Sequence, residues 1–115
     1  MKRVLIGMAG ALALVAFASP ASAQDAKVEK GMKVYADQKC SMCHSVAGKG
    51  NAKGSLDDVG SKLTSADIHQ WIVDPAGMSA KAKADRKPPM PAKYASLPKD
   101  DLDALTAYLS SLKKK

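Results

Sequence analysis

Apolar residues recur at the spacing of an amphipathic helix in three stretches of the chain. The first runs from about residue 26 to residue 39, where Val28, Met32 and Tyr35 share one face among lysines and acidic residues. Gly31 interrupts this helix, and a glycine inside a helix costs ~1 kcal/mol relative to alanine. Either another helix approaches closely at Gly31, or the glycine has no packing role.

Two further helices are predicted in the second half of the chain. Thr64 or Ser65 begins a short helix over residues 66–73, which an aspartate–proline step ends. Pro98 suits the first turn of a helix that extends to about residue 112, and three aspartates follow it. The apolar faces are Ile68, Trp71 and Ile72 in the shorter helix, and Leu102, Leu105, Tyr108, Leu109 and Leu112 in the longer one.

The segments between these helices are predicted to be irregular. Glycines among lysines, serines and aspartates make residues 45–63 a loop, with Leu56 and Val59 as its inward anchors. Residues 76–97 are basic and also irregular. Because no convincing strand pattern occurs, we expect an all-α fold.

Residues 1–23 have the features of a cleaved secretory signal peptide. Two basic residues precede an apolar run over residues 4–18, and residues 21–23 form a small-x-small site. We predict cleavage after Ala23, export to the periplasm and a single domain over residues 24–115. A retained membrane anchor is the alternative, but the run of about fifteen apolar residues is shorter than the ~20 of a spanning helix. No stable membrane insertion is therefore expected after cleavage.

Charge and size bear on the possible partners of the protein and on the stability of its domain. The full chain carries 18 basic and 11 acidic residues, a net charge of +7. Its last three lysines suit the negative end of a helix dipole, so their charge gives no support for a nucleic-acid partner. A domain as small as residues 24–115 buries little surface and has few large core residues, so an apolar disc at its centre would stabilise it.

Both cysteines belong to the sequence Cys40-Ser41-Met42-Cys43-His44, called the attachment motif below. The C-x-x-C-H spacing is that of c-type haem attachment, in which each sulfur adds across one vinyl group of the porphyrin. The following histidine lies beneath the iron, where a neutral imidazole nitrogen binds axially. We therefore predict one haem c, attached through Cys40 and Cys43 and ligated by His44.

Three alternatives remain for this motif. A Cys40–Cys43 disulfide would indicate a thioredoxin-like redox site, although such sites normally belong to a βαβ unit. A structural zinc site needs four ligands, which Cys40, Cys43, His44 and His69 would supply. The third alternative is a chance occurrence, against which the export signal argues.

A proline-rich segment supplies the candidate for the second axial ligand. Between Lys87 and Pro91, three prolines hold Met90 in a rigid, extended backbone. A thioether is a soft ligand suited to a low-spin haem that transfers electrons, so we predict that Met90 ligates the iron. Met78 is the rival in the same region but lacks a stiff frame, and core filling is the alternative role for Met90.

Trp71 and His69 share the predicted helix over residues 66–73. Trp71 is expected to pack at the haem edge and donate its indole N–H to a propionate; a role as a plain core residue is the alternative, and both roles are compatible. His69 falls near the other face, and we interpret it as a solvated residue without a ligand role.

Taken in order, these residues resemble a small bacterial monohaem class I cytochrome c over nearly all of residues 24–115. The matches are Gly31 and Tyr35, the attachment motif, the Trp71 helix with its Asp74-Pro75 end, the Met90-Pro91 step, and Leu105 with Tyr108. The resemblance implies three to five helices wrapped around one covalent haem, with the first and last helices crossing near a right angle. Gly31 would then let aromatic residues of those two helices interlock.

One stretch departs from that family's pattern. The family often has Gly-Pro-x-Leu after the motif, where the proline carbonyl accepts the second N–H of the axial histidine. Here the stretch is Lys53-Gly54-Ser55-Leu56, so this loop is expected to be less stiff. Gly54 or a neighbour still offers a carbonyl for that hydrogen bond.

The resemblance implies a carrier of single electrons rather than an enzyme, since His44 and Met90 together leave the iron no position for a substrate. We expect a monomer whose redox protein partners have acidic docking surfaces. Lys39, Lys49, Lys53 and the lysines of residues 81–93 would steer such partners, with ordinary solubility as their alternative role.

Two other classes of function remain. One is a haem subunit of a larger dehydrogenase or reductase. The other is a haem sensor or peroxidase-like protein, which requires that the Met90 bond be absent or labile.

Overall fold

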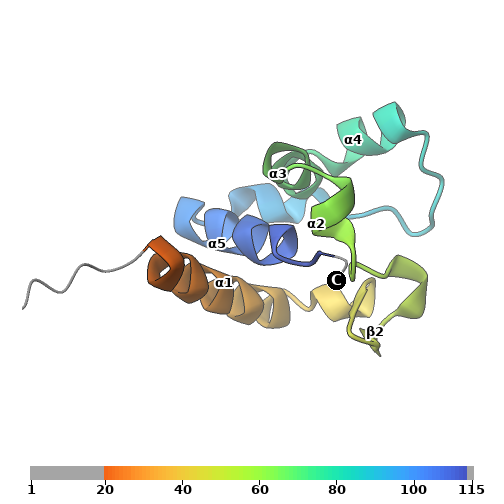
Figure 1. Ribbon diagram of the computed structural model, residues 1–115. Helices are drawn as coiled ribbons and strands as arrows, with labels where there is room; N and C mark the ends of the chain where they lie inside the picture. The colour runs from red at the N-terminus through yellow and green to blue at the C-terminus, as the bar shows by residue number, and fades with distance from the viewer. Residues whose placement is uncertain (1–19, 114–115) are drawn as a thin grey trace, which may run out of the picture.

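Five α-helices form most of the structure between residues 20 and 113, the part of the chain that this computed structural model describes (Figure 1). The elements, with 3₁₀ helices labelled η, are α1 (Pro20–Asp37), η1 (Cys40–Met42), β1 (Ser45–Val46), β2 (Lys49–Gly50), η2 (Ala52–Gly54), α2 (Val59–Lys62), α3 (Ser65–Val73), α4 (Pro75–Ala82), η3 (Ala92–Ser96) and α5 (Lys99–Ser110). No helix in these residues is long and apolar enough to cross a membrane.

The predicted signal peptide lies largely outside the described residues. Residues 1–19 belong to it and are not described. The predicted cleavage position after Ala23 falls within α1 and stays a prediction.

The C-terminal helix α5 forms the centre of the core. α1 and α3 both pack against it (Figure 1). The buried apolar cluster consists of Val34 from α1, Ile68 and Ile72 from α3, and Leu102, Leu105, Tyr108 and Leu109 from α5. The predicted helical fold, with its first and last helices in contact, is therefore confirmed.

The contact between α1 and α5 depends on Gly31. A Cβ atom at this position would collide with the carbonyl oxygen of Ala104 and would lie 2.5 Å from Cβ of Tyr108. Close by, the rings of Tyr35 and Tyr108 meet edge to face, with centroids 5.7 Å apart and planes inclined at 67°. Gly31 thus permits the close approach of the two helices, which confirms its packing role.

A capping box begins α3. The Thr64 hydroxyl accepts a hydrogen bond from the Asp67 N–H at 3.1 Å, and the Asp67 carboxylate accepts one from the Thr64 N–H at 3.4 Å. Ile68 and Ile72 are each 2% exposed, so the apolar face of the helix points into the core. The predicted cap and the end at Val73 are confirmed, and the helix begins one residue earlier than expected.

The prediction that residues 76–97 are irregular is wrong, because α4 and η3 lie within this stretch. The step that ends α3 also begins α4: the Asp74 carboxylate accepts from the Gly77 N–H at 3.1 Å, and Pro75 occupies the first turn. α4 ends where Lys83 adopts a left-handed conformation at φ 53°. Residues 83–91, between α4 and η3, and Leu97 after η3 are the irregular parts of this stretch.

The glycine-rich loop contains a small hairpin and the short helix α2, which the prediction of a plain loop missed. β1 and β2 pair antiparallel around Ala47 and Gly48, both at positive φ, as in a two-residue hairpin turn. The Asp57 carboxylate holds this loop by accepting hydrogen bonds from the Ala47 N–H at 2.6 Å and the Ser55 hydroxyl at 3.2 Å. Strands of two residues leave the helical class unchanged.

The longest helices differ from their predicted bounds at their ends. α1 begins at Pro20 rather than near residue 26, and it ends at Asp37, two residues early. α5 ends at Ser110, and its last turn contains no basic residue. Lys113 therefore lies beyond the helix end that it was expected to complement, and the last two lysines lie outside the described residues.

Gly31→Ala is expected to lower the free energy of unfolding by about 1–3 kcal/mol, the usual cost of overpacking. Helix propensity alone would raise it by ~1 kcal/mol, so the sign of the change separates the two effects. Denaturant unfolding followed by circular dichroism measures this change. Met32→Ala is the control, since Met32 is 51% exposed on the same helix and should matter little. Equal or greater stability of Gly31→Ala would contradict the close helix contact.

Candidate functional site

α1 delivers the attachment motif directly to the core. After Asp37, Lys39 turns the chain through a left-handed conformation at φ 56° into η1, which begins with Cys40. The His44 N–H donates to the carbonyl oxygen of Cys40 at 2.9 Å, so the motif closes one tight turn. Two sulfur atoms and one imidazole are thereby presented by a single short loop.

Cys40 and Cys43 are free thiols, and both are half-buried. Burial raises the pKa of Cys40 to about 11, whereas redox-active C-x-x-C thiols have pKa values below that of free cysteine. The disulfide alternative therefore gains no support. The zinc alternative gains none either, because within residues 20–113 no group of three or more histidine, cysteine, aspartate or glutamate side chains is placed to hold a metal ion.

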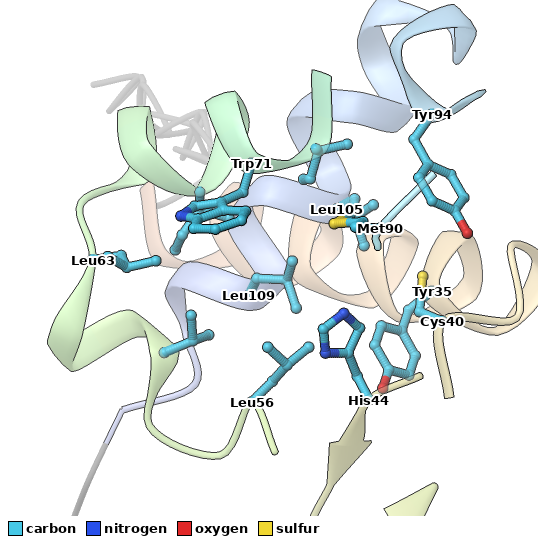
Figure 2. Close-up of a pocket in the computed structure, with 13 residues that line it drawn as sticks. Tyr35, Cys40, His44, Leu56, Leu63, Trp71, Met90, Tyr94, Leu105 and Leu109 are labelled. Carbon is cyan, nitrogen blue, oxygen red and sulfur yellow. The ribbon is translucent and has the colours of Figure 1, made fainter. Parts of the chain in front are cut away.

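The motif forms one wall of an apolar cavity of about 250 Å³ (Figure 2). Helices α1, α3 and α5 and the loop after the motif supply most of the remaining wall. Its apolar residues include Leu56, Val59, Ile68, Trp71, Ile72 and Leu105. The predicted inward anchors of the loop and the predicted apolar face of α3 are therefore confirmed.

A second, wider cavity of about 880 Å³ adjoins the first. The two cavities share Cys40, His44, Trp71, Met90 and Tyr94. Charged side chains line only the wider one, namely Lys39, Lys53, Asp85, Arg86 and Lys87. The site therefore passes from an apolar interior to a mostly basic opening.

The His44 ring projects into the apolar cavity, where a backbone carbonyl holds it (Figure 2). Its Nδ1 atom lies 3.0 Å from the carbonyl oxygen of Gly54, and we assign a proton to Nδ1 from this hydrogen bond. Nε2 then keeps its lone pair for a metal ion. Burial lowers the pKa of His44, and the positive charge of Arg86 lowers it further. The hydrogen bond to Gly54 acts in the opposite direction but has a smaller effect than burial. The imidazole is thus kept in the neutral form that binds metals.

Gly54 supplies the carbonyl that the family pattern assigns to a proline. A Cβ atom at Gly54 would collide with the carbonyl oxygen of Cys43 and would lie 2.9 Å from Nδ1 of His44. Only glycine fits this position without displacing the imidazole. The acceptor of the second histidine N–H is therefore the Gly54 carbonyl, and the lower stiffness expected of this loop stays a prediction.

Asn51 holds the loop against the attachment motif, a role that the sequence reasoning missed. Its N–H lies within hydrogen-bond distance of the carbonyl oxygens of Ser41 at 3.1 Å and His44 at 3.0 Å. Its side-chain amide donates to the carbonyl oxygen of Met42 at 3.3 Å and accepts from the Lys53 N–H at 3.1 Å. The available signal is an asparagine among glycines, which favours side-chain bonds to nearby backbone.

Arg86 also reaches the motif, and the sequence reasoning missed it too. Its Nη2 donates to the carbonyl oxygen of Cys43 at 2.6 Å, across 43 positions of the chain. No local pattern indicates this contact, because Arg86 stands among exposed lysines.

Met90 lines both cavities, and Figure 2 shows its sulfur near Leu105 in the apolar interior. Met78 lines neither cavity and is half-buried in α4. Met32 and Met42 are 51% and 70% exposed. Among the methionines of residues 20–113, Met90 alone contributes to the apolar cavity, which favours it over its rival.

Trp71 is half-buried and lines both cavities, so it packs in the interior and also reaches the basic opening. His69 lies on the same helix and lines neither cavity. The placement of Trp71 suits both of the roles considered for it, and its contact with a propionate stays a prediction.

The residues present fit a covalently bound haem. The thiols of Cys40 and Cys43 are free to form thioethers. The hydrogen bond to Gly54 leaves the other nitrogen of His44 available to iron. The cavity wall beside it is almost wholly apolar, as the face of a porphyrin requires. This combination of features, in a small helical domain, is that of the class of haem proteins.

Residues 28–113 match the cytochrome c family, and the chain belongs to that family. Membership implies electron transfer by haem. The chain is also 31% identical over 93 residues to cytochrome c oxidase subunit 2 of Alkalihalophilus pseudofirmus. That similarity covers 73% of this chain but only 25% of the relative, so the chain spans about a quarter of that protein's length. No solved structure matches the chain.

Tyr35 contributes an unusual polar group to the cavity wall. Its hydroxyl is buried and has no hydrogen-bond partner among residues 20–113. Burial, with a smaller effect of Cys40, raises the pKa of Tyr35 to about 12. The phenol is therefore kept neutral, although no group in the described part of the chain pairs with it.

An absorbance titration is expected to show a tyrosine ionising near pH 12 that disappears in Tyr35→Phe. This pKa exceeds the ordinary value of 10, so the unfolded chain ionises at lower pH than the folded protein. The contribution of Tyr35 to the free energy of unfolding is therefore fully present below pH 10 and is lost as the pH rises to about 12. At pH 7, Tyr35→Phe should leave the free energy of unfolding within about 0.5 kcal/mol or raise it, since an unpaired hydroxyl is removed. A clear loss of stability at pH 7 would show that the hydroxyl has a partner.

Proposed function

We propose that the protein is a periplasmic monohaem c-type cytochrome that carries single electrons between redox partners. The observation that supports this most strongly is that His44 and Met90 line the same apolar cavity. Cys40 lines that cavity as well, and Cys43 lines the adjoining one. We assign thioether attachment to the two cysteines and axial ligation to His44 and Met90. The periplasmic location is supported by the signal features of residues 1–23.

The residues around the site set its chemistry. When bound, the haem iron supplies a one-electron ferric–ferrous couple. Gly54 orients His44 and raises its basicity as a ligand. Met90 is a soft ligand and the walls are apolar, so both disfavour the ferric charge and favour a fairly high reduction potential. Two protein ligands leave no position for a substrate, which is why we propose a carrier and not an enzyme.

Basic residues at the opening support acidic redox partners. Lys39, Lys53, Arg86 and Lys87 line the wider cavity, against a single acidic residue, Asp85. Opposite charge on a partner would raise the association rate, and that rate should fall with added salt. We propose a monomer that docks transiently and has no nucleic-acid partner.

A haem subunit of a larger redox enzyme is the second candidate. The similarity to cytochrome c oxidase subunit 2 favours it, because that relative is about four times as long as the matched part. Gel filtration and co-purification from the native cell separate the two candidates. A carrier elutes alone, whereas a subunit elutes with its enzyme.

Met90→Ala is expected to open the sixth coordination position. The oxidised wild type should show a weak far-red iron–sulfur band, and the variant should lose that band and bind carbon monoxide when reduced. Optical spectra of both oxidation states measure this. Met78→Ala is the matched control and should keep the band, because Met78 lines neither cavity. A high-spin wild type that binds carbon monoxide would contradict the carrier and favour the sensor or peroxidase-like alternative.

A further inference from the structure

The segment that carries Met90 has little backbone hydrogen bonding. Residues 84–91, called the methionine segment, connect α4 to η3. Its Ala84 N–H donates to the carbonyl oxygen of Ser79 at 2.9 Å, and its three prolines have no N–H to donate. Every residue of the segment except Met90 is exposed. Neither burial nor backbone bonding therefore fixes the segment against the rest of the site.

Arg86 provides the missing contact. Its Nη2 donates to the carbonyl oxygen of Cys43 at 2.6 Å. Its Nη1 lies so close to Gly54 that a Cβ atom there would collide with it. Within residues 20–113, the Arg86–Cys43 bond is the hydrogen bond that joins residues 85–90 to the rest of the chain.

This bond ends on the attachment motif, next to the axial histidine. Cys43 immediately precedes His44, and a Cβ atom built on Gly54 would meet both Nη1 of Arg86 and Nδ1 of His44, which places the guanidinium close to the imidazole. Arg86 also precedes Met90 by four positions, with two prolines between them. Because prolines fix φ, a fixed Arg86 restricts where Met90 can lie.

We propose that Arg86 is a positioning residue that holds the methionine segment against the attachment motif and keeps Met90 at the cavity. This role rests on the proposed ligation of iron by Met90. An arginine suits this role because the two terminal nitrogens of its planar guanidinium can contact a carbonyl and a neighbouring backbone segment at once. The single ammonium nitrogen of a lysine cannot make both contacts in this geometry. Without the bond, the segment opens more often, and an external ligand competes more easily with Met90.

Imidazole binding to the oxidised, haem-loaded protein tests this role. Arg86→Met should lower the dissociation constant of imidazole about five- to tenfold, because the open form becomes more populated. The far-red iron–sulfur band should weaken in the same variant. Lys87→Met is the matched control, because it removes the same charge from the same segment. The dissociation constant of imidazole from this variant should stay within about twofold of the wild-type value. Arg86→Lys should resemble Arg86→Met rather than the wild type.

Four outcomes would overturn the proposal. Equal effects of Arg86→Met and Lys87→Met would assign the change to charge alone, and full function of Arg86→Lys would do the same. Unchanged imidazole affinity in Arg86→Met, with the far-red band intact, would remove the positioning role while leaving ligation by Met90 in place, even if the melting temperature falls. A wild type without the far-red band would instead overturn ligation by Met90, and the role of Arg86 with it.

Discussion

The contact between α1 and α5 at Gly31 determines where the site lies. Since no side chain separates the two backbones there, the far end of α1 is brought against α5, and the rings of Tyr35 and Tyr108 meet. The attachment motif begins three positions after α1 ends, so its thiols and imidazole take their place from this contact. α3 packs on α5 as well and adds Trp71 to the wall. A wider spacing at Gly31 would move the motif relative to every other wall of the cavity.

Bonds to backbone carbonyls then fix the individual groups. The Gly54 carbonyl orients His44, Asn51 ties the following loop to the motif, and Arg86 ties the segment before Met90 to the same motif. These bonds depend on the shape of the backbone rather than on a deep core. Among residues 20–113 no large side chain is completely buried, so order at the site comes from hydrogen bonds and close glycine contacts.

Much of this arrangement follows from the sequence, and the remainder has identifiable physical reasons. α1, α3 and α5 could be predicted because their apolar faces repeat over several turns. The attachment motif and Met90 stand out by their spacing and by adjacent prolines. α4 escaped prediction because the Asp74–Pro75 step signals the end of one helix and equally the start of another. Asn51 has only the general signal of an asparagine among glycines. Arg86 acts through a contact 43 positions away that is made only after folding, so no local pattern marks it.

The proposed electron carrier depends on covalent attachment of one haem through Cys40 and Cys43, beside His44. The intact mass of the exported protein, measured after unfolding in acid and denaturant, tests this attachment most directly. We predict the mass of the polypeptide plus one haem, with the addition located in the peptide that contains both cysteines. An unmodified mass, or a mass reduced by the hydrogens lost in a Cys40–Cys43 disulfide, would contradict it.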